Sequence, residues 1–166
     1  MYGSTYGTLK QAILTRLAAV NALSGVSISG NPPVDPLNVT GSDGSGRAIW
    51  ISDAEGAYDN VVMCGQARLD IEEVYDLNIT FQALQRDTGD TQVASDLRVD
   101  TMLYAFLEDM ADDITFGVAA SSDLPLVYIT VSRGSFRRLV GPITGTNKMP
   151  SACVLSLHVE ARISFT

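Results

Sequence analysis

Residues 67–85 read ARLDIEEVYDLNITFQALQ, and this stretch decides the fold. Between residues 67 and 83 the odd-numbered positions are apolar except for Glu73, and the even-numbered positions are polar or charged except for Val74. Because successive side chains of a strand point to opposite faces, this alternation predicts one apolar face and one wet face. The alternation never slips and contains no turn signal, which favours one long, bent strand over a hairpin. Glu73 marks the expected break or bulge.

A turn and an amphipathic helix follow this strand. The turn, residues 86–91 (RDTGDT), contains Gly89, which tolerates positive φ, and Asp90, which suits a helix N-cap. Apolar residues then recur at mostly three- and four-residue spacing, which predicts a helix that lies with one stripe on a sheet. Strand and helix would form the two layers of one domain. The stripe consists of Val99, Leu103, Phe106, Leu107, Met110 and Ile114, with Val93, Leu97 and Tyr104 on its edge.

The flanking segments complete the predicted fold. Residues 8–23 form a first helix, because Thr8 and Gln11 have the spacing of a capping box and Gly25 follows as a stop. Residues 1–7 would be a flexible arm before it. Strands are expected at residues 48–52 and 126–132, and the chain closes on an alternating strand at 153–165.

Loops are predicted where turn-forming residues gather. Residues 30–46 contain three prolines and four glycines, which exclude a helix or a central strand. Residues 53–60 and 133–151 are predicted to be loops as well. The fold class is therefore α+β, with a mixed or antiparallel sheet, two helices packed on one of its faces, and long loops at 30–46 and 133–151. A single domain would span residues 1–166.

Bulk properties limit the class of protein. The chain of 166 residues is 46% hydrophobic and 18% charged, as in an ordinary globular domain. No apolar run approaches the ~20 residues that span a bilayer, and residues 1–10 lack the segments of a signal peptide. We therefore expect synthesis in the cytoplasm and no membrane association. Cys64 and Cys153 are then most simply reduced thiols, a disulfide between them being the less favoured alternative.

Signatures of catalysis and of cofactor binding are weak. His158 is the only histidine, and its place between polar residues favours a cross-strand surface residue over a general base or metal ligand beside Glu160. One histidine and two distant cysteines do not make a zinc site. The glycine-rich run at 41–46 lacks the lysine and the strand-to-helix context of a phosphate-binding loop. We therefore expect no catalytic residues, no metal and no cofactor.

The basic segment 133–151 is the main charge asymmetry. It holds four of the eleven basic residues and no acid, although the whole chain carries a net charge of −8. Such a segment could contact an acidic patch on a neighbouring molecule, with an ordinary flexible loop as an equally weighted alternative. Two acids beside the stripe of the second helix have no explanation in the periodicity. The predicted interaction residues are Arg133, Phe136, Arg137, Arg138, Lys148, Asp96 and Asp100.

The order of these segments resembles a known protein family. A helix (LKQAILTRLAAV, 9–20) precedes a proline-rich loop (NPPVDP, 31–36), a strand (EEVYDLNITFQAL, 72–84) and a helix that opens on an acidic turn (GDTQVASDLRVDTMLYAFLEDM, 89–110). With the alternating final strand, this pattern is similar to that of the tail terminator, or tail completion, proteins of long-tailed bacteriophages, especially of actinobacterial phages. Residues 73–110 match best, whereas the long loops depart from the pattern.

The resemblance implies a structural virion protein and not an enzyme. Tail terminator proteins form a hexameric ring that caps the tail tube, ends tail elongation and joins the tail to the head connector, or stopper, protein. DNA passes through the ring, and the net charge of −8 suits passage without specific binding. The expected location is the tail and neck of the virion. Another tail or connector component, such as a tail tube subunit, is the alternative, and a small enzyme is a third possibility.

Overall fold

One five-stranded sheet and two α-helices make up the part of the chain that the structure describes. The computed structural model describes residues 5–35, 46–64, 68–84, 92–120, 126–140 and 150–165. Its elements are, in chain order, α1 (Thr5–Ala19), the 3-10 helix η1 (Asn21–Leu23), β1 (Ser27–Ser29), β2 (Gly46–Cys64), β3 (Arg68–Leu84), α2 (Gln92–Asp112), the 3-10 helix η2 (Val118–Ala120), β4 (Leu126–Val140) and β5 (Pro150–Phe165).

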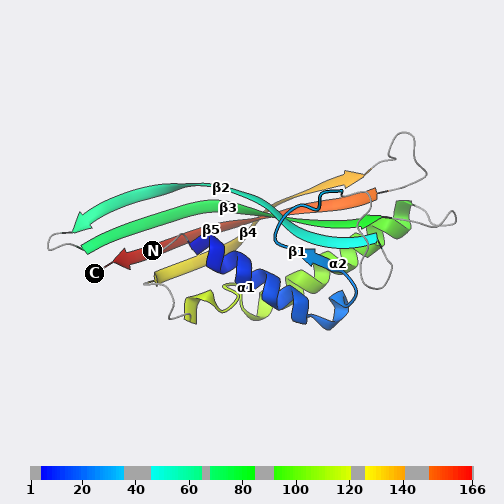
Figure 1. Cartoon of the computed structure of the whole chain (residues 1–166), viewed down its shortest axis with the longest axis horizontal. Coiled ribbons are helices and arrows are strands. Elements are labelled where there is room, and N and C mark those ends of the chain that lie inside the picture. Colours follow the sequence, from blue (N-terminus) through cyan, green and yellow to red (C-terminus); the bar gives the residue numbers. More distant parts are fainter. Residues whose placement is uncertain are drawn as a thin grey trace.

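The sheet is mixed, and both helices lie on one of its faces. The strand order is β1-β2-β3-β5-β4, with β1 parallel to β2 and every other neighbouring pair antiparallel. Figure 1 shows α1 and α2 on the same side of four long strands that extend beyond the helical layer. We call the side under the helices the helix face and the other side the open face. The predicted α+β class, with both helices on one sheet face, is confirmed.

The core lies between the helix face and the two helices. The odd-numbered side chains of β3 from Tyr75 to Ala83 are buried there, as are those of β5 from Cys153 to Ile163. Phe106 of α2 lies at the centre, with its ring centroid 5.6 Å from that of Phe81 and 5.7 Å from that of Phe116. The prediction that the odd-numbered residues of both strands form the apolar face is therefore confirmed. A shift of the register by one residue would turn these apolar side chains to the open face.

The expected bulge lies beside Glu73, but in the neighbouring strand. β3 pairs with β5 in unbroken register from Leu69 to Leu84. The register of β2 against β3 shifts between Ile51 and Ala54, and again between Tyr58, which faces Glu73, and Val61. A bulge bends the strand that contains it, so the irregularity lies in β2 and β3 remains one continuous strand.

Two predicted loops are wrong, because strands pass through them. Residues 53–60 lie inside β2, which pairs with β3 along most of its length. Residues 133–140 belong to β4, which forms a long hairpin with β5, so the predicted loop 133–151 shrinks to residues 141–149, outside the described residues. In the predicted loop 30–46, residues 30–35 carry no helix or strand and Gly46 already begins β2; the remainder also lies outside the described residues.

Both helices have ends that differ from the prediction. α1 begins at Thr5, so residues 5–7 are helical and do not belong to an arm, and Thr8 is not its cap. The helix ends at Ala19, and η1 continues the path to Gly25, whose φ of 81° fits the predicted stop. α2 ends at Asp112, before the exposed Ile114.

The two cysteines are too far apart to form a disulfide within the chain. Cys64 pairs with Arg68 near one end of β3, and Cys153 pairs with Phe81 near the other. These positions on β3 are about 13 residues, or roughly 40 Å, apart at the rise of an extended strand. Cys153 is a free, buried thiol, and burial raises its pKa more than nearby Arg138 lowers it.

Candidate functional site

Three of the seven predicted interaction residues are exposed on β4, at an edge of the sheet. β4 is the last strand in the order, so its outer side has no partner strand among the described residues. Arg133, Phe136 and Arg137 are exposed on it, with 68% of the Phe136 side chain accessible to solvent. Neither arginine forms an ion pair with a described residue. A strand edge with free backbone N–H and C=O groups is a template for pairing with another chain.

Three other predicted residues make contacts within the molecule. Arg138 of β4 forms an ion pair with Asp100 of α2. The Ser151 hydroxyl of β5 donates to Asp96 at 2.5 Å, and the Gln92 amide donates to the same carboxylate oxygen at 3.3 Å. The two acids that periodicity left unexplained therefore attach α2 to the two last strands. Lys148 lies outside the described residues.

An exposed apolar row on α2 lies on the side of the helix that carries Asp100. Val93, Leu97 and Tyr104 are 64%, 60% and 66% exposed. At ~100° per residue, all three lie within about 60° of Asp100 around the helix axis. Asp100 contacts Arg138 of β4, so the row faces the side of the molecule where Phe136 of β4 is exposed. The sequence had placed these three residues at the edge of the buried stripe. They are available for contact with another molecule.

The opposite edge of the sheet has a different character. β1 pairs with β2 only from Ala48 to Trp50, so the rest of β2 has no outer neighbour among the described residues. Asp53 and Glu55 are exposed on this free part of β2. Asp53 accepts a hydrogen bond from the Asn78 amide at 3.0 Å, whereas Glu55 forms no ion pair with a described residue. The two free edges thus carry opposite charges, a feature that the sequence analysis missed.

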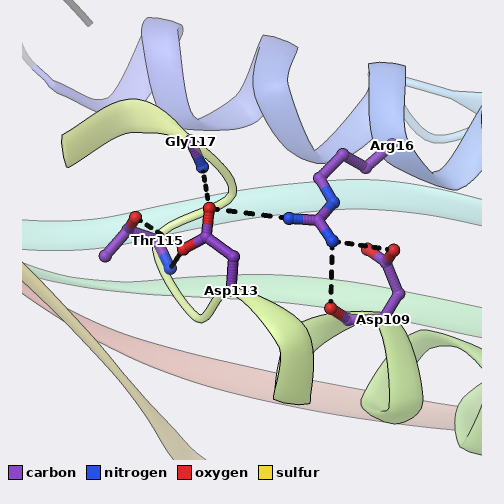
Figure 2. Close-up of polar contacts among 5 residues, drawn as sticks. All are labelled: Arg16, Asp109, Asp113, Thr115 and Gly117. Carbon is purple, nitrogen blue, oxygen red and sulfur yellow. Dashed lines mark hydrogen bonds and ion pairs between the residues drawn. The ribbon is translucent and has the colours of Figure 1, made fainter. Parts of the chain in front are cut away.

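A polar network at the end of α2 joins the two helices (Figure 2). Arg16 of α1 donates to the carboxylate of Asp109 at 2.9 Å and to its backbone carbonyl at 3.2 Å, and lies 3.6 Å from Asp113. The Asp113 carboxylate accepts bonds from the backbone and hydroxyl of Thr115 and from the Gly117 N–H. Burial raises the pKa of Asp113, but these bonds and Arg16 outweigh it, so the pKa lies below its usual value.

This network stabilises a strained turn. Phe116 lies between Thr115 and Gly117, the two residues that donate hydrogen bonds to Asp113, and has φ = 53°, which a bulky residue rarely adopts. Its ring is buried against Phe106, and the Arg16 guanidinium lies 5.8 Å from its centroid. The strained backbone therefore places the Phe116 ring in the core between the helices, and this packing explains the strain.

Glu73 binds the N-terminus of α1. Its buried carboxylate accepts the Thr5 backbone N–H at 2.8 Å and the Thr5 hydroxyl at 2.6 Å, and the Tyr75 hydroxyl lies 3.1 Å from the same Thr5 oxygen. A negative charge at this end of a helix is favoured by the helix dipole. Burial raises the pKa of Tyr75, so its hydroxyl stays protonated and can donate to Thr5.

The open face carries charged pairs between β3 and β5. His158 Nδ1 lies 2.8 Å from Asp76 and its Nε2 lies 3.4 Å from Glu160, which confirms the expected cross-strand surface position. The bond to Asp76 raises the pKa of His158 more than partial burial lowers it. Arg162 pairs with the buried Asp70 at 2.6 Å. Within the described ranges no three metal-binding side chains come together.

No family model matches the sequence, and no curated protein matches it. None of the helices described is long and apolar enough to cross a membrane. What the molecule offers is two free strand edges of unlike charge, together with an exposed apolar row on α2.

Proposed function

We propose that this chain is a structural subunit of a bacteriophage tail, and specifically a tail terminator. Copies would form a closed ring, of six subunits by the sequence resemblance, that caps the tail tube and contacts the head connector protein. The observation that carries the proposal is the pair of unlike free edges, β4 and the outer part of β2, on opposite sides of one sheet. A closed ring needs two different surfaces on each subunit, which meet head to tail.

The charges of the two edges support contact between copies. The β4 edge carries Arg133 and Arg137, and the β2 edge carries Asp53 and Glu55. Opposite charges favour the meeting of unlike edges and disfavour the meeting of like ones. The exposed row on α2 (Val93, Leu97, Tyr104) supplies a further surface for the tail tube or connector protein.

The open face is suited to DNA that passes without binding. Asp76 and Glu160 are exposed on this face on either side of His158, and Arg162 is paired with Asp70 and lies 4.0 Å from Glu72. Cations paired with acids offer few contacts to phosphates, in contrast to the basic surface of a protein that wraps DNA.

Electron microscopy and light scattering of the purified chain test the proposal. A terminator gives closed rings of one size, and added rings shorten the tubes formed by the tail tube protein of the same virus. Long tubes of this chain alone would instead favour the alternative, a tail tube subunit. A protein that stays monomeric up to roughly 100 μM, a concentration at which even micromolar contacts are occupied, would refute the proposal.

Reversal of the unpaired cations gives a sharper test. Arg133→Glu with Arg137→Glu should abolish ring formation, while Glu108→Lys, a charge change on the exposed side of α2, should leave the rings intact. Arg138 is unsuitable for this purpose, because its loss would release Asp100 and disturb the packing of α2. If the protein with both charges reversed formed rings in wild-type yield, the cations of β4 would not contribute to the contact between subunits.

A further inference from the structure

The direction of the strands determines how two copies can extend one sheet. β2, β3, β5 and β4 are antiparallel at each of their contacts, so β2 and β4 run in opposite directions. If the next copy lies beside the first in the same orientation, its β2 edge meets the β4 edge as an antiparallel pair. This is the pairing that continues the existing pattern of the sheet.

Side-chain faces then select the register. Phe136 faces Leu155, on the helix face, and Arg137 faces Val154, on the open face. On β2, Gly56 faces Tyr75, on the helix face, and Glu55 faces Asp76, on the open face. Residues directly opposite each other in an antiparallel pair share a face. Placing Arg137 opposite Glu55 therefore also places Phe136 opposite Gly56.

From these relations we infer, on the basis of the proposed function, that β4 of one copy pairs antiparallel with β2 of the next, with Arg137 opposite Glu55 and Phe136 opposite Gly56. Each pair is complementary. Arg137 and Glu55 are exposed, opposite in charge and without ion pairs to described residues. Phe136, 68% exposed, covers a glycine, and an aromatic ring across from an edge glycine stabilises a strand pair.

The length of the free edge fits this register. β4 continues for three residues beyond Arg137, to Val140, and therefore reaches the bulge of β2 between Ile51 and Ala54. β1 covers β2 only as far as Trp50, so it does not obstruct the incoming strand. In this register Phe136 to Arg138 can pair with Gly56 to Ala54, between the bulge of β4 before Phe136 and the bulge of β2 before Ala54.

Arg137 forms no ion pair with any residue that the structure describes. It borders a cavity of about 400 Å³ in the open face, which Asp53 and Asn78 also line, but it forms no ion pair there. The Asp53 carboxylate accepts the Asn78 amide instead. Arg137 is therefore free of ion pairs to the described residues and can pair with Glu55 of a neighbouring copy.

Charge exchange and cross-linking test this contact. Arg137→Glu should weaken assembly about tenfold or more, as like charges then face each other, and adding Glu55→Arg in the same chain should restore it. Glu108→Lys is the matched control. Separately, Arg137→Cys and Glu55→Cys proteins, both with Cys64→Ser, should cross-link when mixed under oxidising conditions, whereas Arg137→Cys with Glu108→Cys should not.

The outcomes separate this inference from the proposed function. Rings formed by the cysteine variants without the cross-link overturn the inference, as does assembly that Arg137→Glu leaves unchanged, and both results leave the terminator proposal standing. The cross-link in open filaments supports the contact and overturns the terminator, because a head-to-tail contact that fails to close gives filaments. A double charge exchange that assembles no better than Arg137→Glu alone also overturns the inference.

Discussion

Replacement of Glu73 should show how strongly the sheet anchors the first helix. The carboxylate is 3% exposed and accepts two bonds from Thr5, one of them from the first backbone N–H of α1. Glu73→Leu replaces the carboxylate with an apolar side chain of similar size, and it leaves that N–H and the hydroxyl buried without this acceptor. An unpaired buried donor costs about 1–3 kcal/mol, and bonds to charged groups are the stronger ones.

We expect Glu73→Leu to lower the free energy of unfolding by about 3 kcal/mol. Glu73→Gln keeps an acceptor oxygen and loses the charge, so it should cost about 1 kcal/mol. Thr5→Val removes only the hydroxyl, with a similar loss of about 1 kcal/mol. Glu72→Gln is the matched control on the other face of the same strand, and should change stability by less than about 0.5 kcal/mol.

Urea unfolding followed by circular dichroism measures these differences. For a domain of this length, ~3 kcal/mol corresponds to a fall in melting temperature of roughly 6–12 °C. A buried carboxylate can also be a tolerated cost, in which case an apolar replacement is neutral or stabilising. A Glu73→Leu protein as stable as the wild type would therefore refute the reasoning that Glu73 stabilises α1.

Three further changes test the network, the open face and the β2 strand. Asp113→Asn should lower the free energy of unfolding, measured in urea, by about 1 kcal/mol. Because the pKa of Asp113 is lowered in the folded protein, this loss relative to the wild type is complete above the ordinary carboxyl pKa. It disappears as the pH falls through the pKa of the folded state. His158 has a raised pKa, so its stabilising pair with Asp76 is complete below pH ~6.5 and lost as the pH rises through the folded value. An NMR titration in which Asp76→Asn fails to lower the pKa of His158 would contradict this. Gly56→Ala should cost about 2 kcal/mol by urea unfolding, since its Cβ would lie 2.2 Å from that of Tyr75.

The alternation of β3 was sufficient to predict the strand because its signal is local and repeated. Every second residue from Tyr75 to Ala83 is buried, and β5 repeats the pattern from Cys153 to Ile163. Each position supports the same assignment of faces, and one exception, Glu73, does not change it. Central strands that are covered on one face give this pattern most clearly.

The outer strands were misjudged because their sequences depart from that pattern. Residues 53–60 (DAEGAYDN) and 133–138 (RGSFRR) combine glycine with charges, a composition typical of loops. They become strands because the ladders of β3 and β5 satisfy their backbone groups, an effect of tertiary context that exceeds local propensity. Gly134 reflects this context, since a Cβ there would lie 2.8 Å from the Ser156 carbonyl oxygen.

The roles of the isolated acids required the structure for a different reason. Asp100 and Asp96 find their partners in Arg138 and Ser151, on strands far along the chain. Glu73 finds its partner 68 residues earlier, at Thr5. Periodicity could identify these acids as exceptions to a buried pattern. It could not supply the partners, which depend on how the layers pack.

The same charges that obscured the outer strands also limit how they can pair. Two β4 edges meeting each other in a symmetric dimer would bring Arg133 and Arg137 against their own copies, and two β2 edges would bring Asp53 and Glu55 together. Like charges across a strand pair are destabilising, so both symmetric contacts are disfavoured. The head-to-tail contact between β4 and β2 alone joins opposite charges. Because such a contact uses two different surfaces, it leaves one of each free on every growing assembly until a ring closes.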